Sequence, residues 1–115
     1  MKAGEFNRRV QFQRGTLVDD GLQAHLRWNK TDPSQDNHGA PRWAARKDVS
    51  DAERAQAGWI EATVVSRFTV RSSEFTRGLT AKDRLICGGL TFDIQGIKEI
   101  GRSELEITAT ARADL

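Results

Sequence analysis

The sequence predicts an all-β fold, a small antiparallel β-barrel or sandwich of about six strands joined by long loops. Apolar and polar residues alternate from residue 60 to 71, which is the period of a half-buried strand. The same alternation returns from 105 to 111, at the final predicted strand. Between them, two short β-like runs flank Gly88-Gly89. Both glycines can adopt positive φ, so the pair predicts a two-residue hairpin turn.

Four side chains are predicted to form the core: Trp43, Phe68, Phe92 and Ile94. Phe68 lies on the apolar side of the first alternation, and Phe92 and Ile94 share one face of the second hairpin strand. Trp43 belongs to a strand-like run at 43–47. We expect it to anchor the core, because an indole covers more apolar area than any nearby aliphatic side chain.

The chain is expected to form one domain over residues 1–115. A first strand is predicted at 8–14, and residues 22–28 can extend another strand within turn-rich sequence. Residues 28–42, which contain both prolines, are predicted to form a long loop. A second loop is predicted to project at 48–58, since its apolar members after Val49 are alanines, too small to hold a helix against the core.

Composition argues against a strongly charged or membrane-spanning protein. The 18 basic and 16 acidic residues leave a net charge of +2, too small to indicate a nucleic-acid footprint. Cys87 is the only cysteine, so it can form no intrachain disulfide or thiolate metal cluster, and we expect it to be a small buried side chain. No signal-like start or long apolar run occurs. We therefore expect no membrane contact and synthesis in the cytoplasm.

Residues with catalytic potential form no recognisable site. His25 and His38 lie in loop-rich sequence without a second metal ligand at helical spacing. Glu104 and Glu106 are expected on the solvent face of the last strand. No P-loop, dinucleotide fingerprint or nucleophile elbow occurs. We predict no enzyme activity, no cofactor and no metal, which makes a small-ligand barrel or enzyme the weakest reading.

The alternative function is that of a single-stranded nucleic-acid-binding β-barrel, since small barrels bind single strands through exposed aromatic residues and basic grooves. Arg9, Arg67 and Arg71 on outward faces can form a basic stripe. Against this, the chain has no tyrosine, and most of its three tryptophans and five phenylalanines occupy positions predicted to face inward. Nucleic-acid affinity that falls steeply with salt would distinguish this alternative.

The order of the predicted elements resembles the head-tail joining, or head-closure (stopper), proteins of long-tailed bacteriophages and their gene transfer agent relatives. Seven features carry the resemblance: Arg8-Arg9-Val10, an Asp-Gly turn, Trp43-Ala44, a loop with Glu53 and Ala55, the strand ending at 67–71, Asp83-Arg84-Leu85 and the segment 90–97. The resemblance covers nearly the whole chain. The insertion at 28–41 is longer than the family pattern.

The resemblance implies a structural connector that forms a homo-oligomeric ring beneath the portal and adaptor. The ring closes the DNA channel after packaging and presents a docking surface to tail terminator or tail proteins, while DNA passes without sequence-specific binding. It implies that the loop at 48–58 faces the channel, through Asp48, Asp51, Glu53 and Arg54. The protein would reside at the head–tail interface of the virion after synthesis in the host cytoplasm, and the particle could be a phage, a prophage product or a gene transfer agent.

Overall fold

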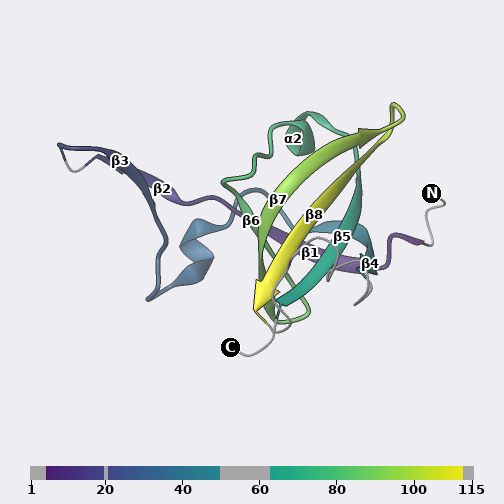
Figure 1. Cartoon of the computed structure of the whole chain (residues 1–115), viewed down its shortest axis with the longest axis horizontal. Coiled ribbons are helices and arrows are strands. Elements are labelled where there is room, and N and C mark those ends of the chain that lie inside the picture. Colours follow the sequence, from purple (N-terminus) through teal and green to yellow (C-terminus); the bar gives the residue numbers. More distant parts are fainter. Residues whose placement is uncertain (1–4, 20, 50–62, 113–115) are drawn as a thin grey trace.

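The computed structural model describes residues 5–19, 21–49 and 63–112. The elements in chain order are β1 (Arg8–Gln13), β2 (Thr16–Asp19), β3 (Ala24–Arg27), the 3-10 helix η2 (Pro33–Asp36), β4 (Arg42–Asp48), β5 (Thr63–Arg71), α2 (Glu74–Arg77), β6 (Arg84–Cys87), β7 (Leu90–Ile100) and β8 (Glu104–Arg112). Six strands form a closed antiparallel barrel in the order β1-β4-β5-β8-β7-β6 (Figure 1). The predicted all-β class and the barrel are confirmed.

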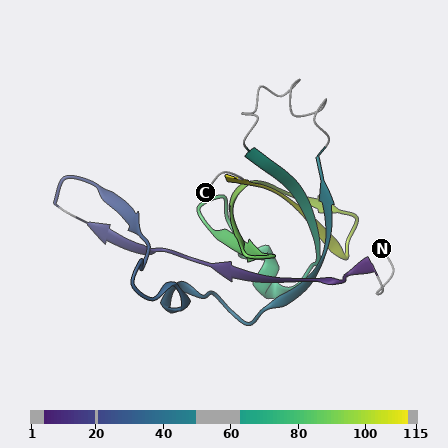
Figure 2. The ribbon, with the colours of Figure 1, turned by 90° about the horizontal axis from the view of Figure 1, so that it is seen from below.

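Strand β1 closes the barrel by pairing with a different strand along each half of its length. Arg8, Arg9 and Val10 pair with β4, whereas the following three residues, 11–13, pair with β6. The other neighbours are antiparallel pairs, of which β5 with β8 is the longest without a register shift. Viewed from below in Figure 2, the barrel strands curve around one enclosed interior. Closure leaves the barrel sheet without a free edge.

The barrel interior is the hydrophobic core. Its buried members are Val10, Phe12, Ala44, Phe68, Val70, Leu79, Leu85, Cys87, Phe92, Ile94, Leu105, Ile107, Ala109 and Ala111. The rings of Phe68 and Phe92 meet edge to face, with their centroids 5.2 Å apart, an arrangement that the ring quadrupoles favour. Three of the four residues predicted for the core, Phe68, Phe92 and Ile94, therefore lie inside the barrel, and Cys87 is buried there as expected.

The prediction that Trp43 anchors the core is wrong, because the structure leaves 55% of this residue exposed. Its neighbour Ala44 points inward and is fully buried, and alternation along a strand then turns Trp43 outward. Three phenylalanines, Phe12, Phe68 and Phe92, fill the interior. At this position of β4 the barrel accommodates an alanine, and the indole is left for the outer surface.

The Gly88-Gly89 hairpin is confirmed. The two glycines connect β6 to β7 with φ of 60° and 80°, and the flanking residues Cys87 and Leu90 pair directly. Positive φ at both turn positions matches the strand twist. Farther along, β7 changes register between Ile94 and Gly96, a bulge that bends the strand as it runs towards the β7–β8 turn.

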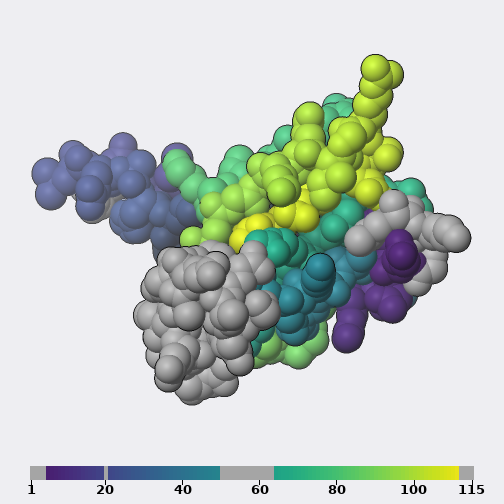
Figure 3. Space-filling view, turned by 45° about the vertical axis from the view of Figure 1, so that its right-hand side comes forward, coloured from purple at the N-terminus to yellow at the C-terminus, as the bar shows by residue number. Residues whose placement is uncertain are grey.

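Strands β2 and β3 form a separate two-stranded ribbon outside the barrel. We call residues 16–27 the arm. It projects from one end of the molecule, as the ribbon in Figure 1 and the surface in Figure 3 show, and it contributes to a longest dimension of 46 Å. The sequence indicated strand potential only at 22–28, and the pairing partner at 16–19 was not anticipated. Residues 28–41, between the arm and β4, contain η2 and an isolated bridge from Asn37 to Gln13.

The short helix α2, which the sequence analysis did not predict, covers the barrel between β5 and β6. Ser73 and Thr76 cap it reciprocally, each side chain bonding to the other's backbone N–H. Phe75 of this helix stacks with the Arg42 guanidinium, 4.3 Å from the ring centroid, and touches Gly39. A Cβ at Gly39 would lie 2.5 Å from the Phe75 ring, so this contact requires glycine. The segment before β4 is thereby held against the barrel.

Candidate interaction surfaces

The described residues contain no group of three or more histidine, cysteine, aspartate or glutamate side chains placed to hold a metal ion. His38 packs on Phe75, with ring centroids 4.9 Å apart. Glu104 was expected in solvent but is buried, and Glu106 pairs with Lys98 at 3.3 Å. Within the described ranges, no helix is long and apolar enough to cross a membrane. The remaining candidates for functional sites among the described residues are two exposed surfaces, described below after the contacts that position them.

The arm is anchored to the barrel by a buried glutamine. Gln13, the last residue of β1, is 1% exposed. Its amide nitrogen donates to the Pro33 carbonyl at 2.9 Å and to Asn37 Oδ1 at 3.1 Å, and its Oε1 accepts from Arg84 Nε at 3.1 Å. The Arg84 guanidinium in turn lies 3.7 Å from the ring centroid of Trp28, the residue that follows the arm. Gln13 is buried because the segment after the arm folds over it.

A second set of contacts fixes the same segment through its backbone. The Arg14 N–H donates to the Asp36 carbonyl at 2.9 Å, and the His38 N–H donates to the Phe12 carbonyl at 2.8 Å. The buried Asp36 carboxylate accepts the Asn29 N–H at 2.7 Å. The segment after the arm is thus bonded to the end of β1 and to Arg14, while β2 and β3 pair with each other.

An ion pair between Arg14 and Asp83 locks the start of the arm to the loop before β6. The guanidinium donates to both carboxylate oxygens of Asp83 at 2.8 Å and to the Gly78 carbonyl at 2.9 Å. Burial raises the pKa of Asp83, but the hydrogen bonds from Arg14 and the Thr80 N–H outweigh it, and the net pKa lies below its ordinary value. A bidentate pair of this kind restricts orientation as well as adding energy. Asp83 therefore has a structural role: it holds the start of the arm against the loop before β6.

One face of the arm is apolar and exposed. Leu17 and Leu26 pair across the ribbon and so share a face, and Asp19 lies on the same face nearer the tip. Leu17 is 67% exposed, and Leu22 at the tip is 94% exposed. A two-stranded ribbon is only marginally stable alone, and exposed apolar side chains grouped on one element indicate an interaction surface.

The opposite end of the molecule carries a depression lined by aromatic and arginine side chains. Phe6, Asn7, Trp43 and Arg71 line an open hollow of about 520 Å³. Arg9, the register partner of Trp43, places its guanidinium 4.7 Å from the indole, and Arg71 lies 4.7 Å from the Phe6 ring. Among the described residues, neither arginine forms an ion pair with a carboxylate. We call this surface the aromatic–arginine depression.

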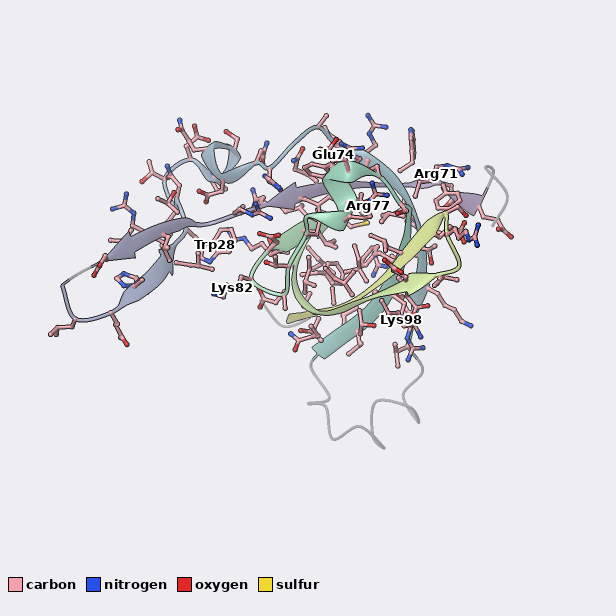
Figure 4. All side chains as sticks on the ribbon, turned by 90° about the horizontal axis from the view of Figure 1, so that it is seen from above. Trp28, Arg71, Glu74, Arg77, Lys82 and Lys98 are labelled. Atoms are coloured by element: carbon pink, nitrogen blue, oxygen red, sulfur yellow. The ribbon has the colours of Figure 1, made fainter. Side chains whose placement is uncertain are left out.

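These two surfaces lie at opposite ends of the long axis. In Figure 4, Trp28 marks the base of the arm on the left, and Arg71 marks the depression on the right. Figures 1 and 2 agree on this separation, with the arm and the start of β1 pointing in opposite directions. A contact between the two surfaces within one molecule is therefore ruled out.

Of the residues predicted to face a channel, Asp48 is described, whereas Asp51, Glu53 and Arg54 lie outside the described residues. Asp48 ends β4 and pairs with Ser66 of β5. Its carboxylate accepts the Ser66 hydroxyl at 2.6 Å and Arg46 Nε at 3.0 Å. The Ser66 hydrogen bond, ahead of Arg46, holds the pKa of Asp48 below its ordinary value. These bonds fix the position from which the chain leaves β4.

The predicted basic stripe divides into two parts. Arg9 and Arg71 both belong to the aromatic–arginine depression. The Arg67 Nε instead lies 3.9 Å from the Glu106 Oε1, and this carboxylate offsets the positive charge of Arg67. The resulting basic surface is confined to one end of the barrel.

Comparison with known proteins identifies a family and a similar solved structure. The family model described as phage head completion protein matches residues 1–112. Among solved structures, a chain from the virion of a native gene transfer agent particle aligns with a TM-score of 0.67 and 23% sequence identity, over 92% of this chain and 94% of that chain. At that identity the second match shows a shared fold. No curated protein matches the chain.

Proposed function

The chain belongs to the phage head completion protein family, and from this premise we propose that it is a structural connector of a tailed, phage-like particle. Copies of the chain assemble as a ring beneath the portal and adaptor. The ring closes the DNA channel after packaging and offers the surface on which tail terminator or tail proteins dock. DNA passes through it without sequence-specific binding, and the protein resides at the head–tail interface of the virion.

Besides the family match, two surfaces at opposite ends of one closed barrel support this proposal. Subunits of a ring contact their neighbours head to tail, so each needs two different surfaces on opposite sides. The arm and the aromatic–arginine depression meet that requirement. The barrel has no free edge through which copies could aggregate by strand pairing.

We assign the channel-facing part to residues 48–58. Three carboxylates, Asp48, Asp51 and Glu53, outnumber the single arginine, Arg54. An acidic excess repels DNA phosphates, which suits a gate that retains a genome without binding it. The hydrogen bond from Ser66 to Asp48 supplies a fixed base for this loop.

The proposal is tested with particles that lack only this chain. We expect DNA-filled heads that lose DNA and carry no tails, and we expect purified protein added to such heads to restore tail joining. Electron microscopy counts tailed particles, and nuclease protection measures retained DNA. Heads that keep their DNA and take tails normally without this chain would overturn the proposal.

The channel assignment has a separate test. Shortening residues 50–58 to a two-residue linker is expected to leave the melting temperature of the purified protein near that of the full chain, because the described strands already form a closed barrel around a buried core. Particles carrying the shortened chain are expected to leak DNA or to fail to join tails. An unfolded variant, or particles that keep DNA and transfer it normally, would show that the segment is a packed part of the barrel.

Single-stranded nucleic-acid binding is the second candidate, and one observation favours it. Trp43 is exposed and flanked by Arg9 and Arg71, a combination on which bases stack in single-strand-binding barrels. Affinity for a labelled oligonucleotide that falls steeply between low and physiological salt, and that is lost in Trp43→Ala, would support it. Absence of binding at low salt would exclude it.

A further inference from the structure

We propose that the arm of each copy docks into the aromatic–arginine depression of the next copy in the ring. This inference rests on the proposed function and deepens it, because it names the two surfaces that join neighbouring subunits. The exposed leucines of the arm would lie against Trp43 and Phe6, and Asp19 would face the arginines at the rim.

The arm lacks the means to bury its own apolar face. Leu17 and Leu26 lie side by side across the ribbon, and Leu17 is 67% exposed. The residue-for-residue pairing of β2 with β3 gives a regular ribbon, and none of the other described strands pairs with it. Burying these leucines against a neighbour would therefore stabilise both the contact and the ribbon.

The depression complements the arm in polarity and in charge. Phe6 and Trp43 contribute aromatic rings to its lining, and its hollow of about 520 Å³ is open to solvent. Arg71, which lines the hollow, and Arg9, which lies over the Trp43 ring, form no ion pair among the described residues. The arm tip presents Asp19, which is followed in the sequence by Asp20. Opposite charges around an apolar contact select the partner and its register.

A second copy of this chain is the occupant that the placement favours. The two surfaces lie at opposite ends of the same molecule, as Figure 4 shows from the positions of Trp28 and Arg71. A contact between different surfaces repeats from copy to copy, and it closes into a ring when the rotation between neighbours allows. The anchors at Gln13 and Arg14 fix the arm on the barrel, so the direction of the next copy is set in advance.

The test is a charge swap within one chain. Asp19→Lys and Arg71→Glu are each expected to lower the number of subunits retained on portal-bearing heads by about tenfold or more, because like charges then face each other in every contact. The double variant Asp19→Lys/Arg71→Glu is expected to restore retention to within a few-fold of the natural chain. Arg102→Glu, in the exposed β7–β8 turn, is the matched control for a reversed arginine and is expected to have no effect.

The readouts separate this inference from the function on which it rests. Melting temperatures verify that each variant is folded. Single variants that bind heads as well as the natural chain would overturn the inference and leave the connector function standing. Two defective single variants without rescue in the double variant would also overturn it, because each surface would then contact a different protein, such as the adaptor or the tail. A natural chain that never joins portal-bearing heads would refute the connector function and this inference with it.

Discussion

The barrel and the arm are built from the same kind of antiparallel pairing, yet they differ in what completes them. Each barrel strand pairs on both sides and turns apolar residues into one interior, where Phe12, Phe68 and Phe92 are fully buried. The arm pairs only with itself and leaves Leu17 and Leu22 largely in water. The described barrel strands therefore bury their apolar residues within one molecule, whereas the arm leaves apolar side chains exposed, which is why we propose that a neighbouring copy covers it.

The largest expected effect is in the barrel core. Phe68→Ala removes a ring that packs edge to face on Phe92, and it is expected to lower the free energy of unfolding by about 3–5 kcal/mol. Chemical denaturation measures the loss. Leu17→Ala, which truncates an exposed leucine of the arm, is the contrasting control and is expected to change the free energy by less than about 0.5 kcal/mol. If both variants lost a similar amount of free energy of unfolding, the arm would contribute to the stability of the monomer as much as the barrel core does.

The next largest loss of stability is expected at the Arg14–Asp83 ion pair, where the arm joins the barrel. Asp83→Asn removes the charge that accepts both hydrogen bonds from Arg14, and it is expected to lower the free energy of unfolding by roughly 1.5–3 kcal/mol at neutral pH. The exposed Asp93→Asn is the matched control.

The pH dependence of this loss follows from the direction of the Asp83 pKa. The folded-state pKa lies below the unfolded value of about 3.9, so the ion pair stabilises the fold above that pH and its contribution disappears as pH falls through the folded pKa. Urea denaturation at a series of pH values should show natural chain and Asp83→Asn converging below about pH 4. If the difference in free energy of unfolding between the two chains stays constant below about pH 4, the Arg14–Asp83 ion pair does not stabilise the fold as described.

A smaller effect is expected at the β6–β7 turn. Gly88→Val forces a β-branched residue into positive φ and is expected to cost about 1–2 kcal/mol. Gly96→Val is the control for adding the same side chain, because Gly96 of β7 does not have a positive φ and a Cβ there meets open space. The comparison of melting curves isolates the backbone cost, and equal curves would show that the turn does not require glycine.

The sequence predicts the barrel well because its strands are long and regularly alternating. The apolar positions of β8, namely Leu105, Ile107, Ala109 and Ala111, are all buried. Trp43 shows the limit of this reasoning. Size and neighbours suggested a core residue, but only the phase of the alternation decides the face, and Ala44 holds the inward position of β4.

The arm and its anchors were harder to predict because they depend on contacts across distant sequence. Turn residues on both sides of the arm made it resemble a loop, and β2 has only four residues. Gln13 is buried through bonds to residues 20 and more positions away. Asp83 pairs with Arg14, 69 positions earlier. Local patterns do not encode such partners, so neither interaction surface could be placed before the fold was known.

The most direct measurement combines stability and assembly in one arm-deleted variant. Gly15 lies against Trp28, so a two-residue Gly-Ser linker can replace residues 16–27 without straining the barrel. We expect a melting temperature within a few degrees of the natural chain and complete loss of stable joining to portal-bearing heads. A variant that joins heads and supports tail attachment as the natural chain does would contradict the account, because the arm would then have no part in connecting subunits.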